Sequence, residues 1–308
     1  MKKEDAVLMG PFVGELYWEC GRFAPMLPFM RSKKYKKRNV KYIIYTREER
    51  FDLYGKFASI LVPLRIDGDY VGKKQPNCFR LNGLNPEEYE EISKKFRKKY
   101  EVKYNIMEHI YPNVKKGFFD RKHQYDRQRM VFKFAPRENN YNLVDAYLPK
   151  DKPIVVISPR FRIGFRRNWI HWQSFYDMLY EDKDLNEFYN FIICGKVNEY
   201  VPDKYDRFLD MNKIKLNGSS SLVGILLVIM EKAFFTFGSQ SAIPNISLLY
   251  KVPVLEFGCQ KSLHTKTYNV HNTSIVFIDD CKYDIEPKKI YENFKKILNR
   301  KKGEIKNG

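Results

Sequence analysis

The chain has 308 residues, of which 44% are hydrophobic and 16% aromatic, so it holds enough apolar material for two domain cores and is not a disordered chain. Its longest apolar run, residues 222–230, is too short to cross a membrane, and the five cysteines have neither the number nor the spacing of a disulfide framework or zinc site. The formal net charge is +19.

The positive charge is concentrated in the first half of the chain. Residues 1–150 carry 32 of the 56 Lys and Arg residues and 19 of the 37 Asp and Glu residues. Such a surface attracts anions, including nucleic acid and acidic membranes. Lys, Asn, Ile, Tyr and Phe are abundant together, which is also typical of an AT-rich genome, so both explanations stay open. The N-terminus lacks the apolar stretch of a secretory signal, and we expect a cytoplasmic location, in part at a membrane surface.

The first half opens with a β-α-β pattern. Residues 6–12 form an apolar run that ends in a glycine-proline turn, and a helical pattern follows over residues 16–30. Residues 40–45 and 60–62 predict further strands. The Asn-Pro-Glu-Glu sequence at 85–88 is typical of a helix start, and that helix should run to about residue 99.

A change of character near residue 150 predicts a domain boundary. Residues 111–147 have a weak pattern and are expected to form an irregular closing segment, and the polar, proline-bearing residues 149–153 follow. We therefore predict a first domain over 1–149, a second over 150–286, and a terminal helix and tail over 287–308.

The second half alternates strands and helices. The continuous β-branched run at 154–157 is typical of a strand covered on both faces. Further strands are expected at residues 188–194, 234–237, 252–257 and 275–278, and helices at 172–180, 222–232, 246–250 and 287–300. This alternation predicts a parallel, doubly wound sheet, which binds ligands at the carboxyl ends of its strands.

Four segments of this half, at residues 154–160, 190–195, 235–242 and 252–258, resemble in order and spacing the donor-binding domain of GT-B glycosyltransferases, above all the heptosyltransferase group. The resemblance implies an α/β fold of two Rossmann-like, doubly wound domains with the active site in the cleft between them. It also implies inverting, metal-independent transfer of a sugar from a nucleotide-sugar donor to an acceptor hydroxyl, with no further cofactor. Heptosyltransferases typically carry Asp-Ser-Gly and a nearby His where this chain has Gly238-Ser239-Gln240-Ser241, so the sugar and the nucleotide stay open.

The predicted donor contacts lie at successive strand ends, where basic side chains and helix N-termini would stabilise charge on the departing diphosphate. They are Gly14, Ser158, Arg160, Arg162, Arg166, Gly195, Lys196, Ser239, Gln240, Ser241, Ala242 and Glu256. Within this set, Glu256 is the predicted partner of ribose or sugar hydroxyls. Each has a plainer interpretation: loop cations are usually solvated, serines cap helices, and Glu256 would bond loop amides. No acid cluster completes a metal site around Asp279-Asp280, and no metal is expected.

Glu15 is the predicted general base for the acceptor hydroxyl. It lies in the Gly14-Glu15-Leu16 turn, which resembles the glycine-acid turn after the first strand of such enzymes. Glu19, one helical turn further on, is the competing candidate. An acid that merely stabilises a helix N-terminus is the alternative for Glu15.

Three other functions fit parts of the sequence. A nucleic-acid-binding protein would use the basic stretch 33–41, and an enzyme that glycosylates modified DNA bases would combine both functions. A pyruvyltransferase-like enzyme on the same fold is the third. The acceptor of a glycosyltransferase would be a glycan, a lipid-linked molecule or modified DNA.

Overall fold

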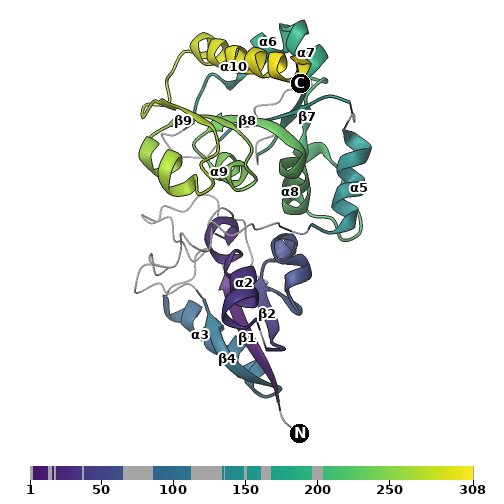
Figure 1. Ribbon diagram of the computed structural model, residues 1–308, viewed down its shortest axis with the longest axis vertical. Helices are drawn as coiled ribbons and strands as arrows, with labels where there is room; N and C mark the ends of the chain where they lie inside the picture. Colours follow the sequence, from purple (N-terminus) through teal and green to yellow (C-terminus); the bar gives the residue numbers. More distant parts are fainter. Residues whose placement is uncertain are drawn as a thin grey trace. The chain divides into compact units, whose positions relative to one another are not determined.

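The computed structural model of the protein describes residues 3–12, 16, 19–36, 38–64, 86–111, 134, 136–148, 151–160, 168–195 and 204–307. The chain divides into two compact units, Met1–Arg137 and Glu138–Gly308 (Figure 1). This division falls before the boundary expected at residue 149. The reason is that α5 (Glu138–Tyr147) packs against α8 (Leu222–Lys232) of the second unit.

The first unit contains a four-stranded parallel sheet in the order β3-β2-β1-β4. The strands are β1 (Glu4–Phe12), β2 (Lys41–Thr46), β3 (Ile60–Pro63) and β4 (Tyr104–Ile110). Strand β1 comes first in the chain and lies between β2 and β4. The winding therefore reverses beside β1, and the carboxyl ends of β1 and β4 form a topological switch point.

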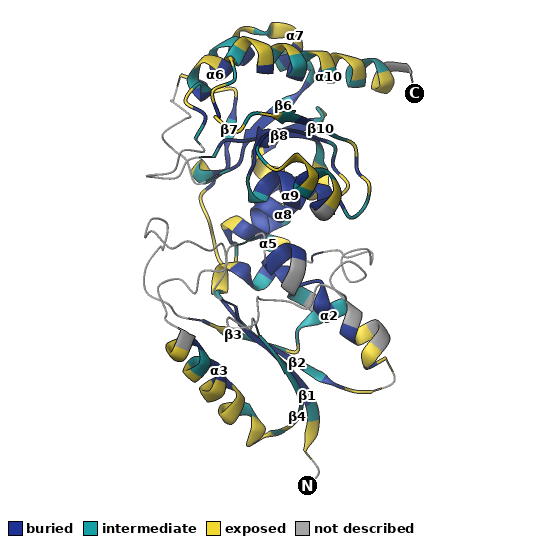
Figure 2. Ribbon diagram, turned by 90° about the vertical axis from the view of Figure 1, so that its left-hand side faces the viewer, coloured by how far each residue is buried: buried dark blue, intermediate teal, exposed yellow. Residues whose placement is uncertain are grey.

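Helix α3 (Pro86–Glu101) covers one face of this sheet, and the short helix α2 (Met26–Phe29) lies on the other (Figure 2). The single regular helix expected over 16–30 is wrong from Glu19 onward. The π-helical turns η1 (Glu19–Phe23) and η2 (Met30–Lys34) flank α2. Pro25 and Pro28 have no N–H to donate, so an unbroken α-helical ladder cannot form across them. Two 3-10 turns, η3 (Glu48–Leu53) and η4 (Gly55–Phe57), follow β2.

The second unit contains a six-stranded parallel sheet in the order β10-β9-β8-β5-β6-β7. Its strands are β5 (Ile154–Ser158), β6 (Asn190–Ile193), β7 (Leu209–Asp210), β8 (Ala233–Ser239), β9 (Val254–Gly258) and β10 (Ile275–Asp279). The chain builds outward from β5 in one direction and then returns to place β8 on its other side. This is the strand order of a dinucleotide-binding fold, with the switch point between β5 and β8. The predicted doubly wound sheet is confirmed.

Helices cover both faces of this sheet (Figure 1). One face carries α6 (Trp172–Glu181), α7 (Lys183–Phe188) and α10 (Pro287–Asn307), and the other carries α8 and α9 (Ala242–Leu249). Two short turns, η6 (Met211–Lys213) and η7 (Leu263–Tyr268), complete the unit. Helix α10 continues beyond its expected end at residue 300 and belongs to the second unit. Among the helices that the structure describes, none has the length and apolar character that a bilayer crossing requires.

The core beneath α6 and α10 is built from aromatic rings. Trp169 and Trp172 are fully buried with ring centroids 5.0 Å apart, and Trp172 also packs against Phe237 of β8. Phe294 of α10 closes the cluster at 5.2 Å from Phe237. These tryptophans therefore anchor α6 to the sheet, and buried aromatic pairs of this kind add to the free energy of folding beyond their area.

Candidate active site

The carboxyl ends of β5 and β8 meet at the switch point of the second sheet. Ser158, the last residue of β5, pairs in register with Gly238 of β8. Gly238 permits this approach, because a Cβ atom there would lie 2.7 Å from the carbonyl oxygen of Ser158. The two loops in which the sequence predicted donor contacts therefore begin side by side.

Five residues from these strand ends form what we call the switch-point edge: Ser158, Arg160, Ser239, Gln240 and Ser241. The hydroxyl oxygens of Ser158 and Ser241 lie 3.2 Å apart, and the Arg160 guanidinium donates to the carbonyl oxygen of Gln240. The edge thus joins the residues that follow β5 to those that follow β8.

Two of the edge hydroxyls are not used as helix caps. Ser241 is the residue before α9, yet its side chain makes no capping hydrogen bond, although serine commonly does so at this position. The Ser239 hydroxyl is fully buried and has no hydrogen-bond partner within the described part of the chain. A buried hydroxyl without a partner is costly, and such groups are found where a ligand or water completes the site.

Gly195 lies against the same edge. A Cβ atom at Gly195 would stand 3.1 Å from the carbonyl oxygen of Pro159, and its own carbonyl accepts from Asn212 at 2.5 Å. Ala242 is the first residue of α9. Five of the predicted site residues lie outside the described residues: Gly14, Glu15, Arg162, Arg166 and Lys196.

Glu256 lies on β9 beneath the edge. It is fully buried, and its Oε1 atom is 3.0 Å from Nδ1 of His264, although the two atoms do not make a hydrogen bond of good geometry. Burial raises the pKa of Glu256, and His264, Arg160 and the Ser241 amide oppose that rise. Glu256 thus faces His264 in this structure. Sequence reasoning assigned no role to His264, because nothing in its spacing indicates that η7 folds against β9.

Glu19 lies in a buried polar cluster of the first unit. Its carboxylate accepts from the hydroxyl of Thr46 at 2.5 Å, the guanidinium of Arg50 at 2.6 Å and the hydroxyl of Tyr54 at 2.7 Å. The side chain is fully buried. A carboxylate that already accepts from three donors away from solvent is a poor proton acceptor for an incoming substrate.

The switch point of the first sheet holds His109, near the end of β4. Its Nε2 atom lies 2.7 Å from the carbonyl oxygen of Gly10, and burial lowers the pKa of His109 to about 4. The imidazole is therefore neutral at pH 7 and donates to Gly10 from Nε2. Gly10 adopts a φ of 102°, a conformation that glycine tolerates and other residues rarely adopt. No sequence pattern indicated His109, since β4 itself was not predicted.

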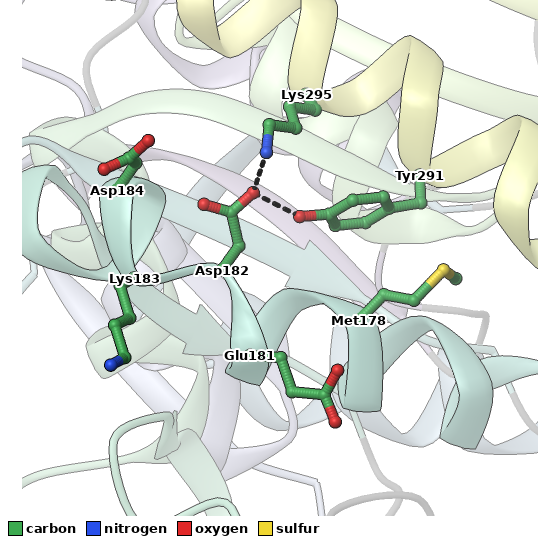
Figure 3. A pocket seen from close by; sticks show the side chains of 7 residues that line it. All are labelled: Met178, Glu181, Asp182, Lys183, Asp184, Tyr291 and Lys295. Atoms are coloured by element: carbon green, nitrogen blue, oxygen red, sulfur yellow. Dashed lines mark hydrogen bonds and ion pairs between the residues drawn. The ribbon is translucent and has the colours of Figure 1, made fainter.

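A pocket of about 430 Å³ lies elsewhere on the second unit (Figure 3). It is lined by residues from the corner between α6 and α7 and from α10: Met178, Glu181, Asp182, Lys183, Asp184, Tyr291 and Lys295. Asp182 accepts from the hydroxyl of Tyr291 at 2.5 Å and pairs with Lys295. This corner leads into the start of β6, at the amino ends of the strands. The switch-point edge lies at the opposite end of the sheet, where doubly wound folds bind their ligands.

The part of the chain that the structure describes contains no group of three or more His, Cys, Asp and Glu side chains placed to hold a metal ion.

Comparison with known proteins places the fold. No protein-family model and no curated protein matches the chain. Among solved structures, ADP-heptose LPS heptosyltransferase II from E. coli aligns with a TM-score of 0.60 at 10% identity, over 97% of this chain and 99% of that one. A family 9 glycosyl transferase from Veillonella parvula aligns with a TM-score of 0.54 at 11% identity, over 91% and 86%. A structure assigned as a UDP-N-acetylglucosamine 2-epimerase from Listeria monocytogenes aligns with a TM-score of 0.50 at 10% identity, over 96% and 88%.

At identities near 10%, these structural alignments show a shared fold and leave the reaction open. The chain therefore has the GT-B fold of the heptosyltransferases, built from two Rossmann-like α/β domains.

Proposed function

We propose that the protein is a glycosyltransferase and that its second unit holds a nucleotide-sugar donor at the switch-point edge. The observation that carries this proposal is the gathering of Arg160 and the hydroxyls of Ser158, Ser239 and Ser241 at one switch point. Solved heptosyltransferases of this fold include one with ADP. The chemistry of the edge suits a similar diphosphate.

The edge would stabilise the negative charge that develops on the departing diphosphate. Arg160 supplies a permanent positive charge, and the N-terminus of α9 supplies backbone N–H groups and the positive end of a helix dipole. The hydroxyls of Ser239 and Ser241 would donate to phosphate oxygens. No step of this mechanism needs a metal ion, so we propose transfer without one.

We propose Glu15 as the general base that takes the proton of the acceptor hydroxyl. Glu15 follows β1, whose carboxyl end lies at the switch point of the first unit. Glu19 is already held by three donors, and we assign it a role in positioning the segment after β1. Attack by a hydroxyl on the face opposite the leaving diphosphate would invert the anomeric carbon.

The test is a thermal-shift panel of UDP-, GDP-, ADP-, CMP- and TDP-linked sugars. A ligand that binds only the folded chain raises the melting temperature by mass action, so one nucleotide should stand out. Product analysis of that nucleotide sugar then separates transfer from epimerisation, because an epimerase changes the sugar while it stays on the nucleotide. A panel in which no compound shifts the melting temperature would refute the proposal.

Two variants locate the site. Arg160→Ala, and the double variant Ser239→Ala with Ser241→Ala, should each weaken nucleotide binding by about 1.5–3 kcal/mol, the cost of losing a hydrogen bond to a charged group. Arg300→Ala and Ser219→Ala are the matched controls, since both side chains are exposed and distant from the edge in sequence. Unchanged affinity in both site variants by calorimetry would move the donor to another part of the protein.

A further inference from the structure

Gln240 links the switch-point edge to the neighbouring strand β9. Its backbone N–H donates to the carbonyl oxygen of Phe257 on β9 at 2.9 Å, and its own carbonyl accepts from the guanidinium of Arg160. The side chain is 6% exposed and packs against the backbone of Gly258. Gln240 is therefore held both through its backbone, which bonds β9 and Arg160, and through its buried side chain.

The orientation of the Gln240 amide follows from its neighbours. Its Oε1 atom accepts from the backbone N–H of Cys259 at 3.1 Å and from the hydroxyl of Tyr283 at 2.9 Å. A backbone N–H can only donate, so the atom that faces Cys259 is the oxygen. The amide nitrogen Nε2 then faces Nε2 of His264 at 2.8 Å and the Oε1 atom of Gln260 at 3.4 Å.

This orientation indicates which ring nitrogen of His264 carries the proton. Nε2 of His264 must accept from the Gln240 amide, so the ring carries its single proton on Nδ1. Nδ1 is the atom that lies 3.0 Å from the carboxylate of Glu256. Glu256 and His264 are 0% and 2% exposed, so solvent does not compete for either group. A second proton, on Nε2 of His264, would place two N–H donors opposite each other, because this atom faces the amide nitrogen of Gln240.

We propose that Glu256 and His264 are positioning residues that hold Arg160 at the switch-point edge by locking the orientation of Gln240. The Gln240 amide donates to Nε2 of His264, the nearby Glu256 carboxyl favours a proton on Nδ1, and the Gln240 carbonyl accepts from the Arg160 guanidinium. This inference rests on the proposed function, in which Arg160 meets the donor phosphates. Neither Glu256 nor His264 needs to touch the donor.

The first measurement needs no ligand. Nitrogen NMR shifts of the histidine rings distinguish a proton on Nδ1 from one on Nε2, and His264→Gln identifies the signal by its loss. We expect the ring proton of His264 on Nδ1, the nitrogen that faces Glu256. A proton on Nε2 would refute the lock.

The second measurement is a double-mutant cycle in which calorimetry measures the binding of ADP, GDP and UDP. His264→Leu removes the acceptor of the Gln240 amide. It should lower the affinity for the nucleotide that the wild type binds by about tenfold. His264→Gln puts an amide oxygen within reach of the same position and should restore most of the affinity. In an Arg160→Ala background, His264→Leu should cause no further loss, because its effect passes through Arg160.

His171→Leu, at a partly exposed histidine of the same unit, is the control and should bind as the wild type does. If His264→Leu does not fold, Gln240→Met removes the same amide at similar volume and should show the same loss. Two outcomes would refute the positioning role alone. One is that the losses of affinity caused by Arg160→Ala and His264→Leu multiply when the two are combined. The other is that His264→Gln binds nucleotide as weakly as His264→Leu. A wild-type chain that binds none of the three nucleotides would refute the proposed function instead.

Discussion

Glu19 and the proposed base Glu15 are expected to have different roles. Glu19 forms a buried ion pair with Arg50, whose side chain is 8% exposed, and two hydroxyls complete its coordination. Desolvation disfavours both charges, so the pair is stable only while every partner is in place. These contacts hold the η1 turn against the end of β2, and they favour a structural role for Glu19 over proton transfer.

The two acids should therefore respond differently to the same substitution. Glu15→Gln should keep the melting temperature and donor affinity but lose roughly two to four orders of magnitude in turnover, the usual contribution of a general base. Glu19→Gln removes the buried carboxylate that Arg50 contacts at 2.6 Å and should lower the free energy of unfolding by about 3–5 kcal/mol. Urea denaturation and steady-state kinetics on both variants test this.

Glu49→Gln is the matched control, because Glu49 is exposed and pairs only loosely with Arg47 at 3.6 Å. It should change neither quantity. A Glu15→Gln enzyme with normal turnover would place the base outside this turn, and a stable but inactive Glu19→Gln enzyme would assign the role to Glu19.

At the scale of elements, the sequence predicted the helices and strands whose own hydrophobic pattern identifies them without tertiary contacts. Helix α8 is apolar over nearly its whole length and has Ser221 as an N-cap, so its bounds were predicted correctly. Strand β4 was missed because it is half-buried along its length and carries polar residues. Helix α5 was expected as irregular chain because its apolar residues form no clear stripe along one face. Its buried residues pack against α8, which is far away in sequence.

The same reasoning explains which site residues the sequence could indicate. Ser158, Ser239 and Ser241 follow buried strands, and parallel strands bring their carboxyl ends to one edge. His264 and His109 depend on contacts that only the folded chain creates, with Glu256 and Gln240 for one and with Gly10 for the other. A single sequence contains no spacing rule for such contacts.

Gly238 tests how closely β5 and β8 must approach, and Gly303 serves as its control. Gly238→Ala would place a Cβ atom 2.7 Å from the carbonyl oxygen and 2.8 Å from the Cβ atom of Ser158, so the strands must separate. We expect it to destabilise the second unit by about 1–3 kcal/mol and to weaken nucleotide binding. Gly303→Ala, in α10 with nothing within 4 Å, should instead stabilise by about 0.5–1 kcal/mol.

Thermal unfolding of both variants gives the two signs directly. A neutral Gly238→Ala variant with unchanged nucleotide affinity would show that the edge does not depend on this close approach.

At the scale of the whole molecule, charge is distributed unevenly between the two units. The first unit, residues 1–137, carries 31 Lys and Arg residues against 17 Asp and Glu residues, and the second carries 25 against 20. On α3 four of the five acids occupy the first half and all five bases the second, and the fifth acid, Glu101, ends the helix. Lys95 pairs with Glu91, and Arg97 pairs with Glu101. This is the arrangement that a helix dipole favours, and it is not a continuous basic groove.

We therefore expect the basic excess to give weak, non-specific DNA binding that disappears near physiological salt. When binding depends on counterion release, the logarithm of the binding constant falls against the logarithm of salt concentration with a slope of about −0.9 for each phosphate contacted. Binding through a few such contacts is therefore lost between roughly 20 and 150 mM salt. Fluorescence anisotropy of a labelled duplex across this range measures the slope. Lys94→Gln with Lys98→Gln, on the exposed part of α3, should reduce it more than Lys289→Gln with Lys296→Gln on α10. Submicromolar binding that persists at about 150 mM salt would instead favour an enzyme whose acceptor is DNA, and equal effects of the two pairs would show that the excess of the first unit has no special role.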